Sequence, residues 1–163
     1  MSTATLASPR FRLAPRTRKA VTVLHVIASV ALLGQVWVNV VVAMIAMWTP
    51  NPDATRFSYT LLQAFVFSSA IPLTLLSLLS GVVLGLGTKW GVLRFRWVSA
   101  KMVLLVLTVL IGSTVQGPLL EQLVAAPSPV VRWAHAATSG VQLVLLVVAT
   151  WLSVFKPGGR IRR

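Results

Sequence analysis

Four long apolar stretches, separated by short polar segments, take up most of the chain. They run over residues 20–48, 59–87, 97–115 and 130–155. A transmembrane helix needs about 20 mostly apolar residues to cross a hydrocarbon core of about 30 Å, and each stretch reaches or nearly reaches that length. The pattern predicts an all-α, polytopic membrane protein. We expect one domain, a four-transmembrane-helix bundle over residues 20–155, between a basic segment at 1–19 and a basic tail at 156–163.

The distribution of basic residues predicts how these spans are oriented across the membrane. Twelve of the fifteen basic residues lie at one side of the predicted membrane: Arg10, Arg12, Arg16, Arg18 and Lys19, then Lys89, Arg94 and Arg96, then Lys156, Arg160, Arg162 and Arg163. The opposite connections hold only Arg56 and Arg132, together with the only two acids, Asp53 and Glu121. Cytoplasmic loops are enriched in Lys and Arg, so we expect both termini and the loop before residue 97 to be cytoplasmic. This rim should attract anionic lipid headgroups. The net charge of +13 therefore indicates a membrane surface as partner, and no nucleic acid.

The amino-acid composition excludes several kinds of catalytic and metal-binding site. The chain has no cysteine, which excludes disulfides and thiolate metal sites. Its two carboxylates fall on the outer connections, so no buried acid pair is expected for proton relay or for a divalent metal. No phosphate-binding glycine loop or Ser-His-Asp arrangement is visible. The Arg, Val, Leu and Ala bias is typical of GC-rich coding, which indicates the inner membrane of a bacterium.

Small residues and prolines predict how the helices pack. Ser77, Gly81 and Gly85 recur every four residues and should let another backbone approach closely. Pro72 should kink the second helix. Pro118 is expected to end the third helix, which leaves a short outer loop over 119–129.

Polar residues within the spans are the remaining clues, because they are costly in hydrocarbon unless they are paired or hydrated. They form stripes that we expect to face the bundle interior. The stripes are His25, Ser29 and Asn39 with Gln35 beside them on the first helix; Lys101, Thr108 and Gly112 on the third; and Arg132, His135, Ser139, Gln142, Ala149 and Ser153 on the fourth.

His25 and Lys101 should both lie roughly 6–8 Å inside the cytoplasmic boundary, since each follows the start of its span by four or five residues. They could share a pocket in which His25 binds haem iron and Lys101 pairs with a carboxylate or acts as a base. Two simpler interpretations stay open: an interhelical hydrogen bond for His25, and a snorkelling ammonium for Lys101. His135 should lie near the outer boundary, about 14 Å from His25 in depth. We therefore expect that the two histidines do not ligate one haem.

Two segments carry a resemblance to known proteins. They read LHVIASVALLG at residues 24–34 and GLGTKWGVLRFRWVSAK at residues 85–101. Over residues 18–155 the chain resembles a family of small four-helix bacterial integral membrane proteins described only as a domain of unknown function. More distantly, it resembles HemJ-type protoporphyrinogen oxidases and copper-resistance D-type membrane proteins. That resemblance implies a haem b cofactor with His25 as ligand and Lys101 as its companion. The chain departs from it late in the third helix, where Ser113 and Gln116 stand in place of a further histidine.

The leading hypothesis for function is a small structural, accessory or binding subunit without catalysis of its own. Its partner would be a second copy of the chain or another membrane protein. One alternative is a haem-binding membrane oxidoreductase that uses His25 and Lys101, with Lys101 as the candidate catalytic residue. The other is a small transporter that uses the polar stripes as a path.

Overall fold

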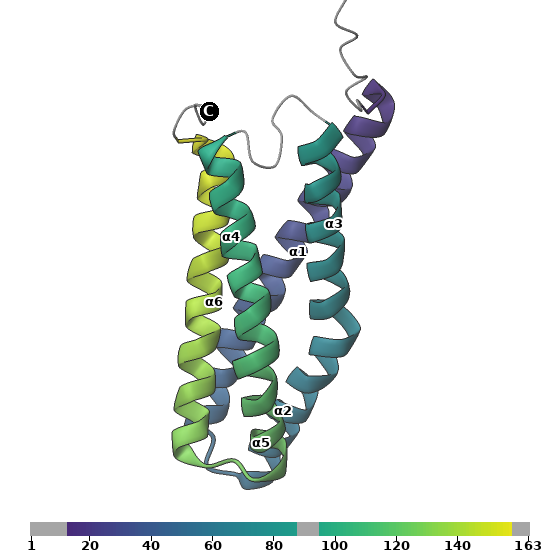
Figure 1. The fold of residues 1–163 in the computed structure, drawn as a ribbon. Coiled ribbons are helices and arrows are strands. Elements are labelled where there is room, and N and C mark those ends of the chain that lie inside the picture. The colour runs from purple at the N-terminus through teal and green to yellow at the C-terminus, as the bar shows by residue number, and fades with distance from the viewer. Residues whose placement is uncertain (1–12, 88–94, 158–163) are drawn as a thin grey trace, which may run out of the picture.

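A computed structural model describes residues 13–87 and 95–157 of the chain. These residues form helices in the order α1 (Pro15–Trp48), α2 (Pro52–Phe65), η1 (Val66–Ala70), α3 (Ile71–Gly87), α4 (Arg96–Ile111), η2 (Gly112–Gln116), α5 (Gly117–Ala125) and α6 (Pro129–Phe155). The short elements η1 and η2 are π-helical turns that join α2 to α3 and α4 to α5 without a break. The protein is therefore an all-α bundle of four long helices (Figure 1).

All four long helices have the length and hydropathy of membrane spans: Pro15–Trp48, Pro52–Gly87, Arg96–Ala125 and Pro129–Phe155. Many large apolar side chains on their outer faces are exposed, for example Val30, Trp37, Leu79 and Val144. Such surfaces suit lipid rather than water. The chain is a multi-pass membrane protein.

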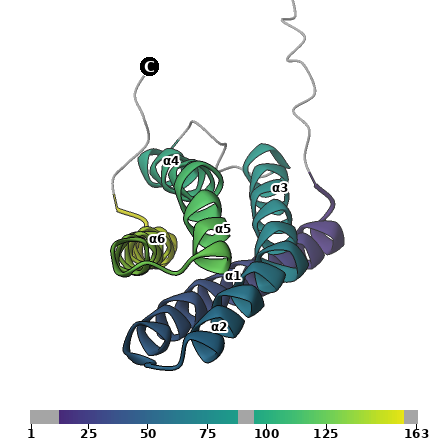
Figure 2. The same ribbon diagram turned by 90° about the horizontal axis from the view of Figure 1, so that it is seen from below.

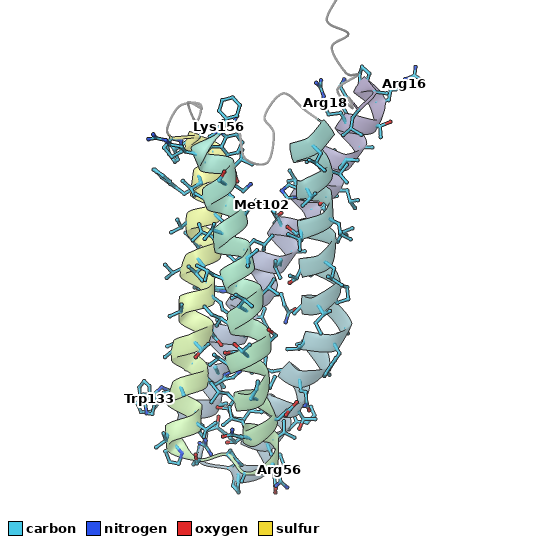
Figure 3. All side chains as sticks on the ribbon, viewed as in Figure 1. Arg16, Arg18, Arg56, Met102, Trp133 and Lys156 are labelled. Carbon is cyan, nitrogen blue, oxygen red and sulfur yellow. The ribbon has the colours of Figure 1, made fainter. Side chains whose placement is uncertain are left out.

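The two ends of the bundle differ in what they hold. We call the end with the start of α1, the end of α3, the start of α4 and the end of α6 the tail end, and the end with the turns at 49–51 and 126–128 the turn end (Figure 1). Arg16, Arg18 and Lys156 lie at the tail end and Arg56 lies at the turn end (Figure 3). Lys19 and Arg96 belong to the first turns of α1 and α4 at the tail end, and Arg132 belongs to the first turn of α6 at the turn end. Seven further basic residues of the charge prediction lie outside the described residues: Arg10, Arg12, Lys89, Arg94, Arg160, Arg162 and Arg163.

Each turn at the turn end is fixed by a helix cap. The Asn51 side chain accepts hydrogen bonds from the backbone N–H groups of Asp53 and Ala54, at 2.9 and 3.3 Å. Ser128 accepts one from the N–H of Val131 at 3.4 Å. In both helices the next residue is proline, which is favoured in the first helical turn because it has no N–H to leave unpaired. The turns can therefore be only three residues long.

Both internal prolines lie just after a π-helical turn. Pro72 follows η1 and Pro118 follows η2, each by two residues. In each turn the N–H that comes just before the proline bonds a carbonyl five residues back: Ile71 to Val66, and Gly117 to Gly112. The wider turn lets the chain absorb a proline within a span. The prediction that Pro118 ends the third helix is wrong, because the helix continues to Ala125 and the predicted loop over 119–129 shrinks to 126–128.

The helices pack in the order α3, α1, α6, α4, and α3 makes little contact with α4. Figures 1 and 2 show α1 crossing behind the bundle between α3 and α6. Near the turn end, α2 packs on α5 and on α1 around a buried cluster of Ala46, Tyr59, Leu62, Leu120 and Leu123. A smaller cluster of Leu32, Val36 and Leu146 lies farther along the bundle, where α1 packs on α6. The four helices thus close around a core at the turn end, while α3 and α4 stay apart.

Candidate functional site

His25 on α1 contacts the middle of α3. Its Nδ1 lies 3.1 Å from the backbone oxygen of Ser77 and 3.0 Å from Oγ of Ser80. One turn along α1, Oγ of Ser29 lies 2.9 Å from Oγ of Ser77. The ring is half-buried, whereas Ser77 and Ser80 are buried. We call His25, Ser29, Ser77 and Ser80 the tail-end cluster, and it joins α1 to α3 through polar contacts.

The small residues of α3 make room for this imidazole. A Cβ atom on Gly81 would lie 3.1 Å from Cε1 of His25, tighter than ordinary van der Waals contact. Ser77 and Gly85, the other members of the predicted small-residue face, are buried. The helix that approaches this face is α1, which brings the ring of His25 against the backbone of α3.

Lys101 on α4 is half-buried and lies in the same half of the bundle as His25, near the start of α4. The two carboxylates of the chain, Asp53 and Glu121, belong to α2 and α5 and lie near the turn end. Neither can reach an ammonium near the start of α4. Lys101 is therefore a half-buried lysine with no Asp or Glu side chain near it.

Two further polar contacts cross the middle of the bundle. Oγ of Ser69, in η1, donates to Oε1 of Gln35 at 2.9 Å, and the amide of Gln35 lies 3.5 Å from Oδ1 of Asn39. On the other side, Nε2 of Gln142 donates to the backbone oxygen of Thr108 at 3.2 Å. A side chain in place of Gly112 would meet that amide at 3.3 Å. These bonds pair the polar residues with one another between helices, as expected for groups inside a membrane bundle.

A second cluster lies beside the buried core near the turn end. The ring of Tyr59 on α2 meets the ring of His135 on α6 edge to face, with centroids 5.7 Å apart and planes at 82°. One turn along α6, Oγ of Ser139 accepts a hydrogen bond from Nε2 of Gln116 at 2.6 Å. Arg132 precedes His135 by one turn of α6. We call Tyr59, Gln116, Arg132, His135 and Ser139 the turn-end cluster.

The two histidines lie in different clusters at opposite ends of one span. His25 contacts Ser77 and His135 contacts Tyr59, and these two partners are about 27 Å apart along α2 and α3 at 1.5 Å per residue. Two imidazoles on one metal need nitrogens about 4 Å apart. Among the described residues, no group of three or more His, Asp or Glu side chains could hold a metal ion. The structure therefore keeps the two histidines apart, as their predicted depths require.

The structure places the residues of the polar stripes in several groups. Asn39, Thr108, His135, Ser139 and Gln142 are buried, while Ser29, Lys101 and Arg132 are half-buried. The sequence prediction omitted Ser69, Ser80 and Tyr59, and it considered Gln116 only as a poor replacement for a histidine. A π-helical turn brings Ser69 to Gln35, and Ser80 lies one turn from Ser77 on the face that α1 covers. Tyr59 lies within α2 and not at the start of a span, because the second span begins at Pro52.

Comparison with known proteins gives no relative from which an activity could be carried over. No family model matches the chain, and neither a curated protein nor a solved structure matches it.

Proposed function

We propose that the chain is a small binding or accessory subunit of a bacterial inner membrane, and that it receives its ligand or partner between α3 and α4 at the tail end. The observation that carries this proposal is the near absence of contact between α3 and α4, where His25 contacts α3 and Lys101 lies on the tail-end half of α4. A closed four-helix bundle packs each helix on two neighbours. Here α3 and α4 each lack one neighbour along much of their length.

The chemistry of this border favours a ligand with a negative charge. Neither Asp53 nor Glu121, the two acidic side chains of the chain, lies within reach of Lys101, and His25 and the serines beside it supply polar atoms. A partly buried cation is costly in a membrane unless it is paired or hydrated. A phosphate or carboxylate on the ligand would pair with Lys101, and the apolar flanks of α3 and α4 would hold an apolar body.

Native mass spectrometry of protein released from its own membranes in a mild detergent tests this proposal. We expect a discrete bound species on the wild type that is lost from Lys101→Gln. The control is Lys19→Gln, which removes the same charge from an exposed position at the same end. A wild type without any bound species, or one that all three proteins retain equally, contradicts the proposal.

Haem b is a second candidate ligand, and the surroundings of His25 favour it. If Nδ1 carries the proton and donates to the backbone oxygen of Ser77, Nε2 keeps its lone pair for iron. The ring lies against Gly81, and Lys101 on α4 would pair with a propionate. Bound haem would supply one-electron redox chemistry. Of the two histidines, only His25 would hold the iron, because His135 is too far away to bind the same haem.

An absorbance spectrum tests the oxidoreductase alternative. It requires a Soret band from wild-type protein purified after haem supplementation, and loss of that band in His25→Ala but not in His135→Ala. No Soret band in the wild type rules out this alternative and leaves the binding-subunit proposal standing, because other anionic ligands remain. The transporter alternative has less support, since the polar residues are paired across helix interfaces in separate groups.

A further inference from the structure

Four buried polar atoms have no hydrogen-bond partner in the described part of the chain, and all four belong to the turn-end cluster. They are the hydroxyl of Tyr59, Oε1 of Gln116, Nε of Arg132 and Nδ1 of His135. Tyr59, Gln116 and His135 are 0%, 5% and 1% exposed. Leaving such an atom unpaired is unfavourable, and more so in a membrane, where no bulk solvent is near. Several unpaired polar atoms in one cluster indicate that a single bound molecule pairs with them.

The contacts within the cluster bring three of these side chains to neighbouring turns of α6. His135 meets Tyr59 ring to ring, and Ser139, four residues later on the same face, is bonded to Gln116. Four residues rise only about 6 Å along a helix. Tyr59, Gln116 and His135 therefore approach the same interhelical space from α2, η2 and α6. Arg132 adds its Nε one turn nearer the turn end.

We propose that Tyr59, Gln116 and His135 enclose a site for bound water within the bundle. The atoms are of both kinds: the tyrosine hydroxyl and the arginine Nε donate, the glutamine oxygen accepts, and the imidazole nitrogen does either according to its tautomer. Water both donates and accepts, and a buried water typically makes about three hydrogen bonds. An anion would be repelled by the glutamine oxygen, and a metal ion by the arginine. Water is thus the ligand that matches the set.

The two π-helical turns explain why the proposed water site lies beside the buried apolar core. η1 and η2 let α2 and α5 lean on each other over the core, and Tyr59 and Gln116 come from these two bent spans. Arg132 is half-buried, and its terminal nitrogen lies 3.5 Å from the backbone oxygen of Pro127 in the α5–α6 turn. It extends from the site toward the surface at the turn end. Water would exchange along Arg132.

Radiolytic labelling in water enriched in oxygen-18 tests for the bound water directly. Hydroxyl radicals formed from a bound water oxidise the side chains that touch it, and Tyr59 is the only tyrosine of the chain. We expect Tyr59 to be labelled although it is fully buried, and the labelling rate to fall several-fold in Gln116→Leu. The control is Thr60→Val, an exposed neighbour whose hydroxyl bonds its own helix, which should label as the wild type does. An unlabelled Tyr59, or an equal rate in Gln116→Leu, overturns the proposal.

A second test compares the unfolding constant of Tyr59→Phe with that of the wild type, and the direction of the change shows whether water bonds the hydroxyl. If water bonds the hydroxyl, removing it loses a hydrogen bond worth about 1 kcal/mol, and the unfolding constant rises about fivefold. If the hydroxyl is unpaired, removing it leaves the constant unchanged or lowers it, which overturns the proposal. The measurement is repeated with chloride replaced by gluconate. A wild-type protein that loses stability without chloride, when Tyr59→Phe does not, shows that a halide rather than water fills the site and also overturns the proposal.

Discussion

The two ends of the bundle are built on different principles. At the turn end, α2 and α5 close over the core, and the largest fully buried side chains of the described residues gather there, among them Tyr59, Leu62, Leu123 and His135. At the tail end, α1 is joined to α3 by hydrogen bonds, α4 packs on α6, and α3 barely touches α4. Packing in membranes depends on close contact rather than on the hydrophobic effect. The turn end therefore holds the fold together, and the tail end has surface left for a ligand.

The largest expected effect concerns which end faces the cytoplasm, because the outcome is all or none. From the uneven distribution of basic residues we predict a cytoplasmic tail end. A phosphatase fused after Arg163 should be inactive, and one inserted after Asn51 should be active. An active phosphatase at the C-terminus would reverse the assignment and place the His25 side of the bundle on the outer face.

Removing a core side chain at the turn end should cost far more stability than the same change at the tail end. Leu123→Ala empties a fully buried position, and we expect a loss of about 2–3 kcal/mol. Leu86→Ala, near the end of α3, shortens a side chain that is 62% exposed and should cost less than about 0.5 kcal/mol. Reversible unfolding in mixed micelles measures both. Similar losses would mean that the two ends contribute equally.

Filling the small-residue face of α3 should disturb the tail end alone. Gly81→Leu forces a side chain against the ring of His25, and we expect a loss of about 1–3 kcal/mol together with the His25–Ser77 contact. The control Val83→Leu enlarges an exposed residue two positions away and should have little effect. Thermal unfolding in detergent compares them. Equal effects would mean that α1 does not cover this face.

The smallest expected effect is the coupling between Ser29 and Ser77. Interhelical hydrogen bonds in membranes average about 0.6 kcal/mol in double-mutant cycles. The single variants Ser29→Ala and Ser77→Ala and the double variant should give a coupling of this size, since the two hydroxyls lie 2.9 Å apart. A coupling energy of zero would mean that the Ser29–Ser77 hydrogen bond adds no stability and that only packing holds α1 to α3 there.

The sequence predicted four apolar helices and the all-α bundle, because spans are set by hydropathy over about 20 residues, an average that one misjudged residue hardly changes. It did not predict the continuation past Pro118. A proline ends a helix where its missing N–H leaves a carbonyl unpaired, but here the N–H of Gly117 bonds Gly112 five residues back. That choice depends on packing from α5 and α6 and is not visible in a local pattern. The tail-end partners of His25 were beyond prediction for a similar reason, since Ser77 and Ser80 belong to another helix.

The π-helical turns also affect how this chain can vary over evolution. Removing one residue from η1 would restore an ordinary helix and rotate everything before it by about 100° relative to α3. Tyr59 would turn away from His135 while α3 kept its place beside α1. A single-residue deletion is usually tolerated in a loop. Here the deletion would rotate α2 relative to α3 and so move the side chains at the turn end. Homologues that keep the buried tyrosine should therefore keep the spacing between it and Pro72, even where the residues between them differ.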